Sequence, residues 1–365
     1  MFTTAQFRVF TTEPEERVLS RPRNFLRQGN NTEAEASYQE VVRDYPELKA
    51  AWAEYFQLLR AEGRFDDALA LAEQVRSRFG DDALSFALRG AAQIELGSFR
   101  EALESLERAA QQDPNFGMVW HEMGYAAFRM GQPGPALLAL DRAFALDPRS
   151  GTLHLRGKIL RNSGQYLAAE VAFSGAAESA EFPEQRAEAE KQIAITRRYA
   201  GFERRPCDIA PTRRWFAETG AVLLVAGGEA RIPSDEEIVA GLVRLSMDLG
   251  WRFTAVVKGD AWPGWDGLGG ALGAPVIAGG AAEMGAVPLA VVRRPHQAGD
   301  AWMAASARIH ASKAGLTFVL EQPDGQHVAD VAGHLAGMDR GSLDLAFAVQ
   351  CAVHPEGRLK GRKLR

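Results

Sequence analysis

The sequence predicts an α-helical solenoid over its N-terminal half and an α/β domain with a mostly parallel sheet over its C-terminal half. In the first half, glycine recurs at spacings of 34, 34, 34 and 33 residues, at Gly29, Gly63, Gly97, Gly131 and Gly164. In the second half this period disappears, and short apolar runs alternate with amphipathic segments. A fixed period of this length is typical of stacked helix-turn-helix units. Strands that alternate with helices favour a layered α/β fold.

Other residues keep the same register as these turn glycines. An alanine follows each glycine five residues later, at Ala34, Ala68, Ala102, Ala136 and Ala169. Seven residues before three of the turn glycines there is another glycine, at Gly90, Gly124 and Gly157. About one helical turn before this position there is a large apolar residue, at Trp52, Phe86, Trp120 and Leu153. Units close at Pro46, Gly80, Pro114 and Pro148. Glycine ends a helix in a left-handed turn without steric cost, so the pattern predicts closely packed helix pairs.

This register resembles that of the tetratricopeptide repeat (TPR) family over about residues 15–180. The resemblance implies units of two antiparallel helices, with ligands lying in a concave face lined by the first helix of each unit. The first unit departs from the pattern, because Pro22 falls inside its expected first helix and would break or shorten it. We therefore expect a degraded first repeat over residues 15–46, in which only the second helix is predicted. Residues 182–198 are expected to form the terminal helix that caps a solenoid.

The resemblance also identifies candidate ligand-binding residues on the concave face. Carried over by register, they are Arg60, His121, Tyr125, Arg129, His154, Lys158, Arg161 and Asn162. These residues make the groove basic in the last two repeats, and they do not reproduce the lysine-asparagine carboxylate clamp of chaperone-binding relatives. Because charge-assisted bonds to carboxylates are strong and orienting, we expect an acidic segment or a free C-terminus as ligand. The alternative is a solvated face, or a groove filled by the second domain.

Composition and charge argue against several classes of protein. Residues 1–202 carry 24 basic and 29 acidic side chains and residues 203–365 carry 18 of each, so neither half is basic enough to make nucleic acid the main partner. The two cysteines predict neither a disulfide framework nor a metal site, and they favour a reducing compartment. Residues 1–10 lack the pattern of a secretory signal. The weakly polar stretch at 276–292 is too short and too broken to span a bilayer. We expect a cytoplasmic protein.

After about Phe202 the residues indicate strands and helices in alternation. Apolar runs predict strands at residues 221–226, 253–258, 275–278, 287–292, 316–320 and 345–353. Several runs are continuously apolar, as strands buried on both faces of a sheet are. Ser234 and Glu237 form a capping box for a helix that ends at Gly250, and further helices are expected at about 300–314 and 326–336. The alternation predicts an α/β domain over residues 203–357, followed by a basic tail at 358–365.

Polar residues at the expected carboxyl ends of these strands form a second candidate site. Ligands of open α/β sheets bind beyond the carboxyl ends of the strands. The residues found there include Lys258, Asp260, Arg293, Arg294, His296 and His354. One interpretation is a polar pocket for an anionic small molecule. The other interpretation is that these are ordinary loop residues, because every buried strand is followed by a polar loop at the surface.

Glycines, histidines and cysteines of the second half predict no cofactor or metal site. The pair Gly279-Gly280 matches neither the dinucleotide fingerprint nor the P-loop, so it indicates a turn. The histidines lack metal-ligand spacing; His327 and His334 are expected to lie on the surface of a helix. A Cys–His nucleophile pair that uses Cys207 or Cys351 stays an alternative without a supporting signature. Within its apolar run, Cys351 fits a small core residue.

Two other features of this half could contact a partner or serve only the fold. Trp262 and Trp265 flank Pro263-Gly264 in a loop and could anchor a partner, but we expect them to fold back over the core or the junction with the solenoid. The tail at 358–365 carries five positive and no negative charges. It could contact an acidic partner, an anionic membrane or nucleic acid, but we expect it to be solvated and disordered.

The sequence favours a two-domain protein-interaction adaptor. We expect the TPR-like solenoid at residues 1–202 to bind a protein or an acidic peptide, and the α/β domain to act as effector or second docking surface. No catalytic residue, cofactor or metal ion is predicted. One alternative is an enzyme whose site lies at the strand ends, with the solenoid selecting its substrate or partner. Another is a structural component that self-associates.

Overall fold

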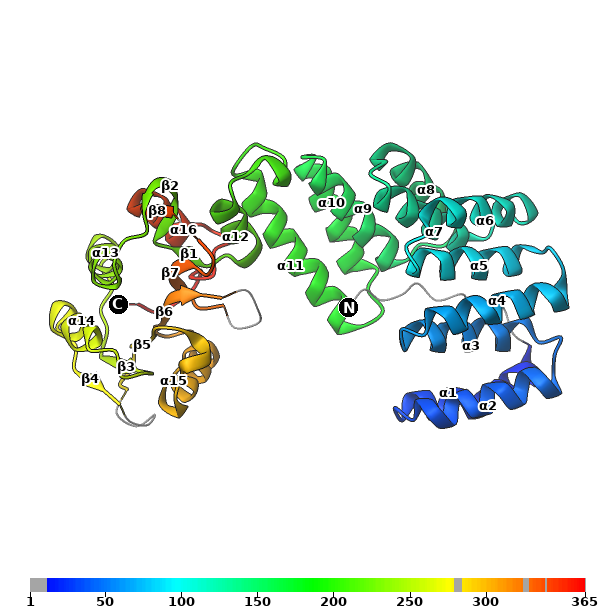
Figure 1. Ribbon diagram of the computed structural model, residues 1–365, viewed down its shortest axis with the longest axis horizontal. Coiled ribbons are helices and arrows are strands. Elements are labelled where there is room, and N and C mark those ends of the chain that lie inside the picture. Colours follow the sequence, from blue (N-terminus) through cyan, green and yellow to red (C-terminus); the bar gives the residue numbers. More distant parts are fainter. Residues whose placement is uncertain (1–11, 279–283, 324–327, 339, 365) are drawn as a thin grey trace. The chain divides into compact units, whose positions relative to one another are not determined.

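A stack of paired helices forms the N-terminal part of the chain (Figure 1). The computed structural model describes residues 12–278, 284–323, 328–338 and 340–364. Within these ranges, ten helices of 13 to 15 residues follow one another: α1 (Glu13–Arg27), α2 (Asn31–Asp44), α3 (Lys49–Ala61), α4 (Phe65–Phe79), α5 (Ala83–Glu95), α6 (Phe99–Gln112), α7 (Gly117–Arg129), α8 (Pro133–Leu146), α9 (Ser150–Asn162) and α10 (Tyr166–Glu178). The five turn glycines all have φ between 73° and 79°, which glycine adopts without strain. The predicted solenoid is confirmed.

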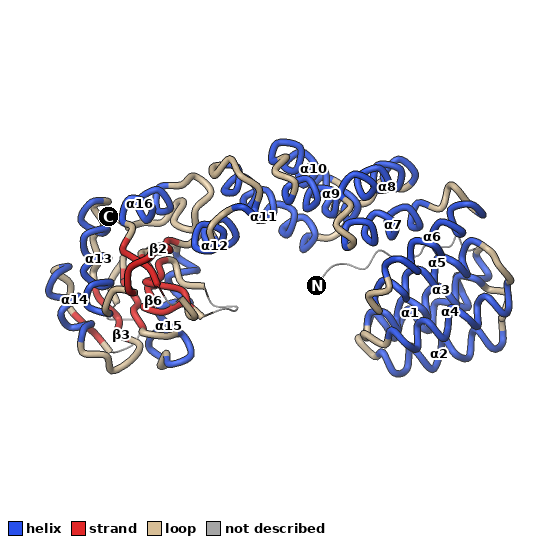
Figure 2. The backbone as a smooth tube through the Cα atoms, turned by 45° about the horizontal axis from the view of Figure 1, so that its top comes forward, coloured by secondary structure: helices blue, strands red, loops and turns tan. Residues whose placement is uncertain are grey.

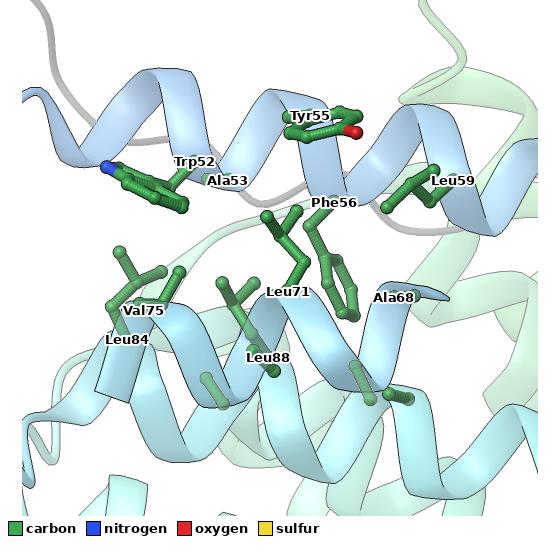
Figure 3. Packing of buried hydrophobic residues seen from close by; sticks show 14 of the residues in the cluster. Trp52, Ala53, Tyr55, Phe56, Leu59, Ala68, Leu71, Val75, Leu84 and Leu88 are labelled. Atoms are coloured by element: carbon green, nitrogen blue, oxygen red, sulfur yellow. The ribbon is translucent and has the colours of Figure 1, made fainter. Parts of the chain in front are cut away.

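Small residues bring the two helices of a pair into close contact. A Cβ atom at Gly157 would lie 2.8 Å from the ring of Phe173, and one at Gly124 would lie 2.7 Å from the side chain of Leu140. The alanines that follow the turns are fully buried. Large side chains fill the space between neighbouring pairs, as Figure 3 shows for α3, α4 and α5. One core therefore continues from α1 to α7, as stacked repeats require.

Pro22 does not break the first helix, contrary to the prediction. Helix α1 continues through this residue to Arg27. Proline removes one backbone hydrogen bond, but Pro22 and Leu19 are buried, and Arg23 forms an ion pair with Glu54 at 2.6 Å. Tertiary packing, which supplies most helical stability in proteins, outweighs the local loss. Helices α1 and α2 therefore form a complete first pair.

The chain divides into two compact units between Glu190 and Lys191, earlier than the boundary expected at residue 202. The division falls inside α11 (Pro183–Ala200), which occupies the segment expected to cap the solenoid. Near the end of this helix, the buried side chain of Arg198 donates a hydrogen bond to the carbonyl oxygen of Ala217 at 2.7 Å. The last turns of α11 thus belong to the core of the second unit.

The second unit contains a six-stranded parallel sheet in the order β1-β7-β6-β5-β3-β4. Its strands are β1 (Val222–Leu223), β3 (Ala255–Lys258), β4 (Val276–Ile277), β5 (Pro288–Val292), β6 (Leu316–Gln322) and β7 (Val331–Leu335). A separate antiparallel pair consists of β2 (Val225–Arg231) and β8 (Arg340–Leu343). In the described residues, all strands lie in this unit (Figure 2). The mostly parallel sheet is therefore confirmed.

Helices cover both faces of this sheet. They are α12 (Pro211–Thr219), α13 (Asp235–Asp248), α14 (Gly264–Leu272), α15 (Asp300–Ser312) and α16 (Leu345–Val353), with short 3-10 turns at Pro206–Asp208 and Pro295–Gln297. Because successive strand residues point to opposite faces, Val256 packs in one core with α12, α13, α14 and α16. The next residue, Val257, packs in the other core with α15. The central strands are thus buried on both faces.

Three predicted elements differ from the structure. The sequence predicts a strand at residues 345–353, but they form α16, whose buried residues Phe347, Ala348 and Cys351 have helical spacing. A helix is predicted at 326–336, but residues 331–335 form β7, and part of the range before it lies outside the described residues. The run at 221–226 is divided between β1 and β2. Continuously apolar runs do not distinguish a buried strand from a buried helix.

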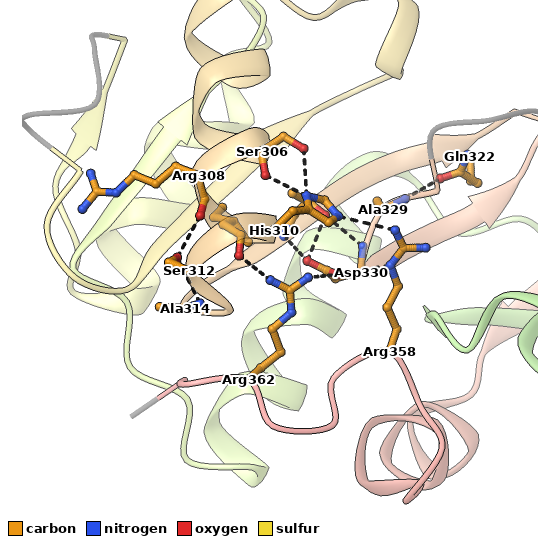
Figure 4. Close-up of polar contacts among 12 residues, drawn as sticks. Ser306, Arg308, His310, Ser312, Ala314, Gln322, Ala329, Asp330, Arg358 and Arg362 are labelled. Atoms are coloured by element: carbon orange, nitrogen blue, oxygen red, sulfur yellow. Dashed lines mark hydrogen bonds and ion pairs between the residues drawn. The ribbon is translucent and has the colours of Figure 1, made fainter. Parts of the chain in front are cut away.

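The basic C-terminal segment is folded, contrary to the prediction of a disordered tail. Asp330, which is fully buried before β7, accepts a hydrogen bond from Arg362 Nη2 at 2.7 Å and lies 3.3 Å from Arg358 Nε (Figure 4). Its other oxygen accepts from the backbone N–H and the hydroxyl of Thr317 at 3.0 and 3.1 Å. Leu359 and Leu364 are buried as well. The positive charges compensate a carboxylate that would be strongly destabilising alone.

The close packing in α9 predicts opposite effects of alanine at two of its glycines. Gly157→Ala should lower the free energy of unfolding by about 1–3 kcal/mol, because the new methyl group meets Phe173. Gly151→Ala is the matched control in the same helix: it has open space around it and should raise stability by up to about 1 kcal/mol through helix propensity. Urea unfolding of the full chain, followed by circular dichroism, measures both. Equal effects of the two substitutions would contradict a close contact between Gly157 and Phe173.

Candidate functional site

The candidate groove residues lie on first helices of their pairs, but Arg60 is not exposed there. Its side chain on α3 is 6% exposed and donates to Glu95 on α5 at 2.6 Å and to Glu122 on α7 at 3.1 Å. Glu122 is itself only 3% exposed. The three residues link three successive helix pairs. Because two carboxylates compensate its charge, Arg60 stabilises the stack and does not present a cation to a ligand.

His121 and His154 pack into the solenoid as neutral side chains. His121 Nδ1 lies 3.0 Å from Thr152 Oγ1, and the ring of His154 meets that of Phe173 edge to face, with centroids 5.4 Å apart. Burial lowers the pKa of both imidazoles, that of His154 to about 4, and the charge of nearby Lys158 adds to the shift of His154. Both residues contribute shape and hydrogen-bonding groups, but no positive charge at neutral pH.

Arg129, at the end of α7, is an exposed cation held by aromatic rings. Its guanidinium carbon lies 4.6 Å from the ring centroid of Phe99 and 5.7 Å from that of Tyr125. Its Nη1 donates a hydrogen bond to the hydroxyl of Tyr125 at 2.9 Å. Within the part of the chain that the structure describes, Arg129 forms no ion pair with a carboxylate. The charge is therefore oriented by the fold but not neutralised by it.

Lys158, Arg161 and Asn162 lie on the next first helix, α9. The Arg161 guanidinium lies over the ring of Phe173, 5.6 Å from its centroid, and both cationic side chains are half-buried. Asn162 is exposed and ends α9 as Arg129 ends α7. The register thus places these polar groups on adjacent first helices. We call the surface formed by Tyr125, Arg129, Lys158, Arg161 and Asn162 the first-helix face.

Asp260, a candidate at the strand ends, is engaged in holding its own loop. One carboxylate oxygen accepts from the indole N–H of Trp265 at 2.6 Å and from the backbone N–H of Trp262 at 3.0 Å. The other accepts from the backbone N–H of Arg293 at 2.5 Å. These bonds join the loop after β3 to the end of β5. Asp260 therefore has a structural role that accounts for both of its oxygens.

The cations at this edge pair with carboxylates of the same unit. Arg294 binds Glu321 at 2.5 Å, Arg293 lies 3.1 Å from Asp235, and Lys258 lies 3.5 Å from Asp266. His296 is exposed in the turn after β5. This edge therefore gathers five of the six predicted strand-end residues, but their charges are largely compensated within the protein.

His354 is not at this edge, because the residues before it form α16 rather than a strand. Its Nδ1 accepts from the backbone N–H of Glu356 at 3.0 Å, its ring packs 5.5 Å from that of Phe216, and burial lowers its pKa. The strand order reverses between β3 and β5, where ligands of open α/β sheets bind. There the backbone N–H of Gly299 donates to the carbonyl oxygen of Gly259 at 2.9 Å, which joins the two loops directly.

The remaining motifs of the second half belong to its core or carry no metal site. Trp265 is fully buried and meets Trp262 at 4.5 Å between ring centroids, so the pair folds back over the core. Burial raises the pKa of the Cys351 thiol, the opposite of what a nucleophile needs.

The histidines and glycines of the second half do not form a site in the described residues. His334 lies on β7, whereas His327 and Gly279-Gly280 lie outside the described residues. The described residues contain no metal-binding cluster and no helix long and apolar enough to cross a membrane.

Glu122 and Phe99 decide the roles of two candidate arginines, although neither is among the predicted site residues. Glu122 neutralises Arg60, and Phe99, on α6 of the preceding helix pair, supports Arg129. Glu122 is the only acid in α7, which is a signal in the sequence. Phe99 gives no such signal, because its contact depends on how consecutive pairs are stacked.

Two arginine substitutions distinguish the structural cation from the presented one. Arg60→Met should lower the free energy of unfolding by about 3–5 kcal/mol, because it leaves a buried carboxylate uncompensated. Arg129→Met should lower it by less than about 1 kcal/mol, the value of an exposed cation–π contact. Urea unfolding of the full-length variants gives both numbers. Comparable losses would show that Arg129 is also structural.

The lowered pKa of His154 predicts a dependence of stability on pH. Between pH 6.5 and about 4 the unfolded chain takes up a proton that the folded chain excludes, so stability should fall as the pH falls through this window. His154→Gln removes this contribution, and the advantage of the wild type over the variant should shrink from pH 7 to pH 4.5. Melting temperatures across this range test the sign. A constant difference would mean that His154 titrates normally in the folded state.

Comparisons with known proteins address the first half of the chain. Residues 25–92 match a family model described as a tetratricopeptide repeat. Solved structures similar to this chain include a thermophilic TPR protein of Thermus thermophilus, with 16% identity over 49% of this chain and 98% of that chain and a TM-score of 0.44. Another is PilF of Pseudomonas aeruginosa, with 16% identity over 52% of this chain and 89% of that chain and a TM-score of 0.41. A third is YrrB, a TPR protein with an unusual peptide-binding site, with 20% identity over 45% of this chain and 84% of that chain and a TM-score of 0.34. No match was found among curated proteins.

The repeat register, the helix pairs and the family match agree. Repeats of this class stack into extended surfaces that bind other proteins, so this part of the chain is an interaction scaffold in that general sense. The N-terminal region of the chain is a tetratricopeptide-repeat region.

Proposed function

We propose that the solenoid is an adaptor that binds an acidic peptide segment of a partner protein on the first-helix face. The observation that carries this proposal is the state of Arg129. It is exposed, its guanidinium is oriented by Phe99 and Tyr125, and it forms no ion pair with the described residues. A carboxylate that binds it would gain a charge-assisted hydrogen bond without first displacing a carboxylate of the described residues.

The contrast with Arg60 supports a binding role for Arg129. Both arginines lie near the ends of first helices, and both contact aromatic rings. Arg60 is surrounded by Glu95 and Glu122, as a buried structural cation must be. Arg129 lacks such partners among the described residues, and the rings reduce the freedom that its side chain would lose on binding. Preorganisation of this kind favours affinity.

Neighbouring groups extend the proposed site along α9. Asn162 can donate to and accept from a peptide backbone, and it occupies the phase of Arg129 in the next pair. Lys158 and Arg161 add positive potential beside it, and Glu188 also acts electrostatically on this region. Tyr125 offers an apolar ring face next to the arginine. The arrangement suits an extended segment with acidic and apolar side chains.

For the second unit we propose the role of an effector or a second docking surface. At the strand ends, Asp260 holds its own loop, and the cations Lys258, Arg293 and Arg294 pair with carboxylates. The loops after β3 and β5 are joined by a backbone hydrogen bond where the strand order reverses. These contacts support a closed edge more than a reaction site.

A peptide-selection experiment tests the adaptor proposal. A displayed library of random 12-residue peptides is selected on full-length wild type, Arg129→Glu and Arg142→Glu. Arg142 is a matched control: it is exposed on α8 and forms no hydrogen bond or ion pair with the described residues. Wild type and Arg142→Glu should enrich peptides rich in Asp and Glu, and the dissociation constant of a selected peptide should rise about tenfold or more in Arg129→Glu.

Fluorescence anisotropy with the selected peptide, repeated at higher salt, gives these constants. Binding should weaken with salt, since exposed charges are screened. A library without acidic enrichment, or an equal loss in the two variants, would reject the proposed site.

A further inference from the structure

A cavity of about 410 Å³ lies in the second unit, away from the strand-end residues considered above. It is lined by Leu249 and Trp251 after α13, Ala352 and Val353 at the end of α16, and Leu359, Arg362, Lys363 and Leu364 of the C-terminal segment. Its volume falls within the range of small-molecule sites, although it is more open to solvent than an enclosed pocket. Six of the eight lining residues are apolar, but the exposed lining is as polar as it is apolar, so it suits a ligand that has both an apolar and a polar part.

The apolar wall continues onto exposed surface. Val353, which lines the cavity, is 63% exposed, and Met247, the penultimate residue of α13 and two residues before the lining residue Leu249, is 64% exposed. The wall is supported from behind by the Asp330 cluster, which holds the Arg362 side chain at 6% exposure. Arg362 is therefore part of the wall, and its charge is already compensated.

Three further cations lie on chain segments joined at this cavity. The backbone N–H of Arg252 donates to the carbonyl oxygen of Leu364 at 2.7 Å, and that of Lys363 donates to Lys313 at 2.9 Å. Arg252, Lys313 and Lys363 are all exposed. In the described chain none of them forms an ion pair. Asp248 is near in sequence but does not line the cavity. A surplus of positive charge therefore borders an apolar recess.

We propose that this cavity binds a small amphiphilic anion, with its apolar body against Trp251, Val353 and Leu359 and its anionic headgroup at Lys363. Charge complementarity selects the headgroup, because Lys363 lines the cavity and Arg252 adjoins it. The apolar wall selects the body. Asp330 fixes the site indirectly, since it holds Arg358 and Arg362 and thus the segment that forms one side of the cavity. This site is independent of peptide binding by the solenoid.

Fluorescence of the anionic dye 8-anilinonaphthalene-1-sulfonate (ANS), titrated with full-length protein, tests the proposal. The dye should bind, octanoate should displace it, and octylamine, with the same apolar body and the opposite charge, should not. Lys363→Glu and Val353→Asp should each raise the dissociation constant about tenfold or more. Both side chains are exposed, so circular dichroism should stay unchanged. Lys360→Glu is the matched control on the same segment, because Lys360 does not line the cavity.

Four results would overturn the proposal. One is the absence of dye binding or of displacement by octanoate. Another is equal affinity for octylamine and octanoate, which would show that charge plays no part. The third is an equal effect of Lys363→Glu and Lys360→Glu. Binding to anionic lipid vesicles without binding of free octanoate would likewise replace a small-molecule site by a membrane contact.

Discussion

The distance between paired helices is the constraint on which the solenoid and its proposed binding face depend. Glycine at position 157 lets the backbone of α9 approach Phe173, and Gly90 and Gly124 do the same against Leu106 and Leu140. These three pairs therefore pack in the same way, and stacking repeats the arrangement along the chain. Because the pairs are alike, residues at the same repeat position, such as Arg129 and Asn162, lie at equivalent positions on successive first helices.

Within this frame, identical residue types serve different ends according to their surroundings. Arg60 meets two carboxylates inside the stack, whereas Arg129 meets aromatic faces and water. The same holds in the second unit, where Arg362 is enclosed with Asp330 and Lys363 of the same segment is exposed. Charge alone does not identify a binding residue. The presence or absence of a compensating partner separates cations that hold the fold from those that can hold a ligand.

The sequence predicts the fold best where periodicity carries information. The turn glycines and their alanines predict the solenoid, and the capping box at Ser234 predicts the start of α13, where both reciprocal hydrogen bonds form. Prediction fails at Pro22, whose local penalty is overcome by packing, and at 345–353, where a nearly continuous apolar run hides the helical period. It also fails at 331–335, a five-residue strand too short to show a clear period. For the candidate sites, register predicts which helix carries Arg60, but the partner Glu122 comes from two pairs further on.

The C-terminal segment has a consequence for how the protein is made. The chain is synthesised from its N-terminus, so the N-terminal repeats can fold before the residues of the second unit have been made. Until Arg358 and Arg362 emerge, the carboxylate of Asp330 has no cation to accompany it into the interior. The sheet can therefore complete its core only after residues 358–362 have been synthesised. The solenoid and the second unit are thus expected to fold one after the other, with the second unit later.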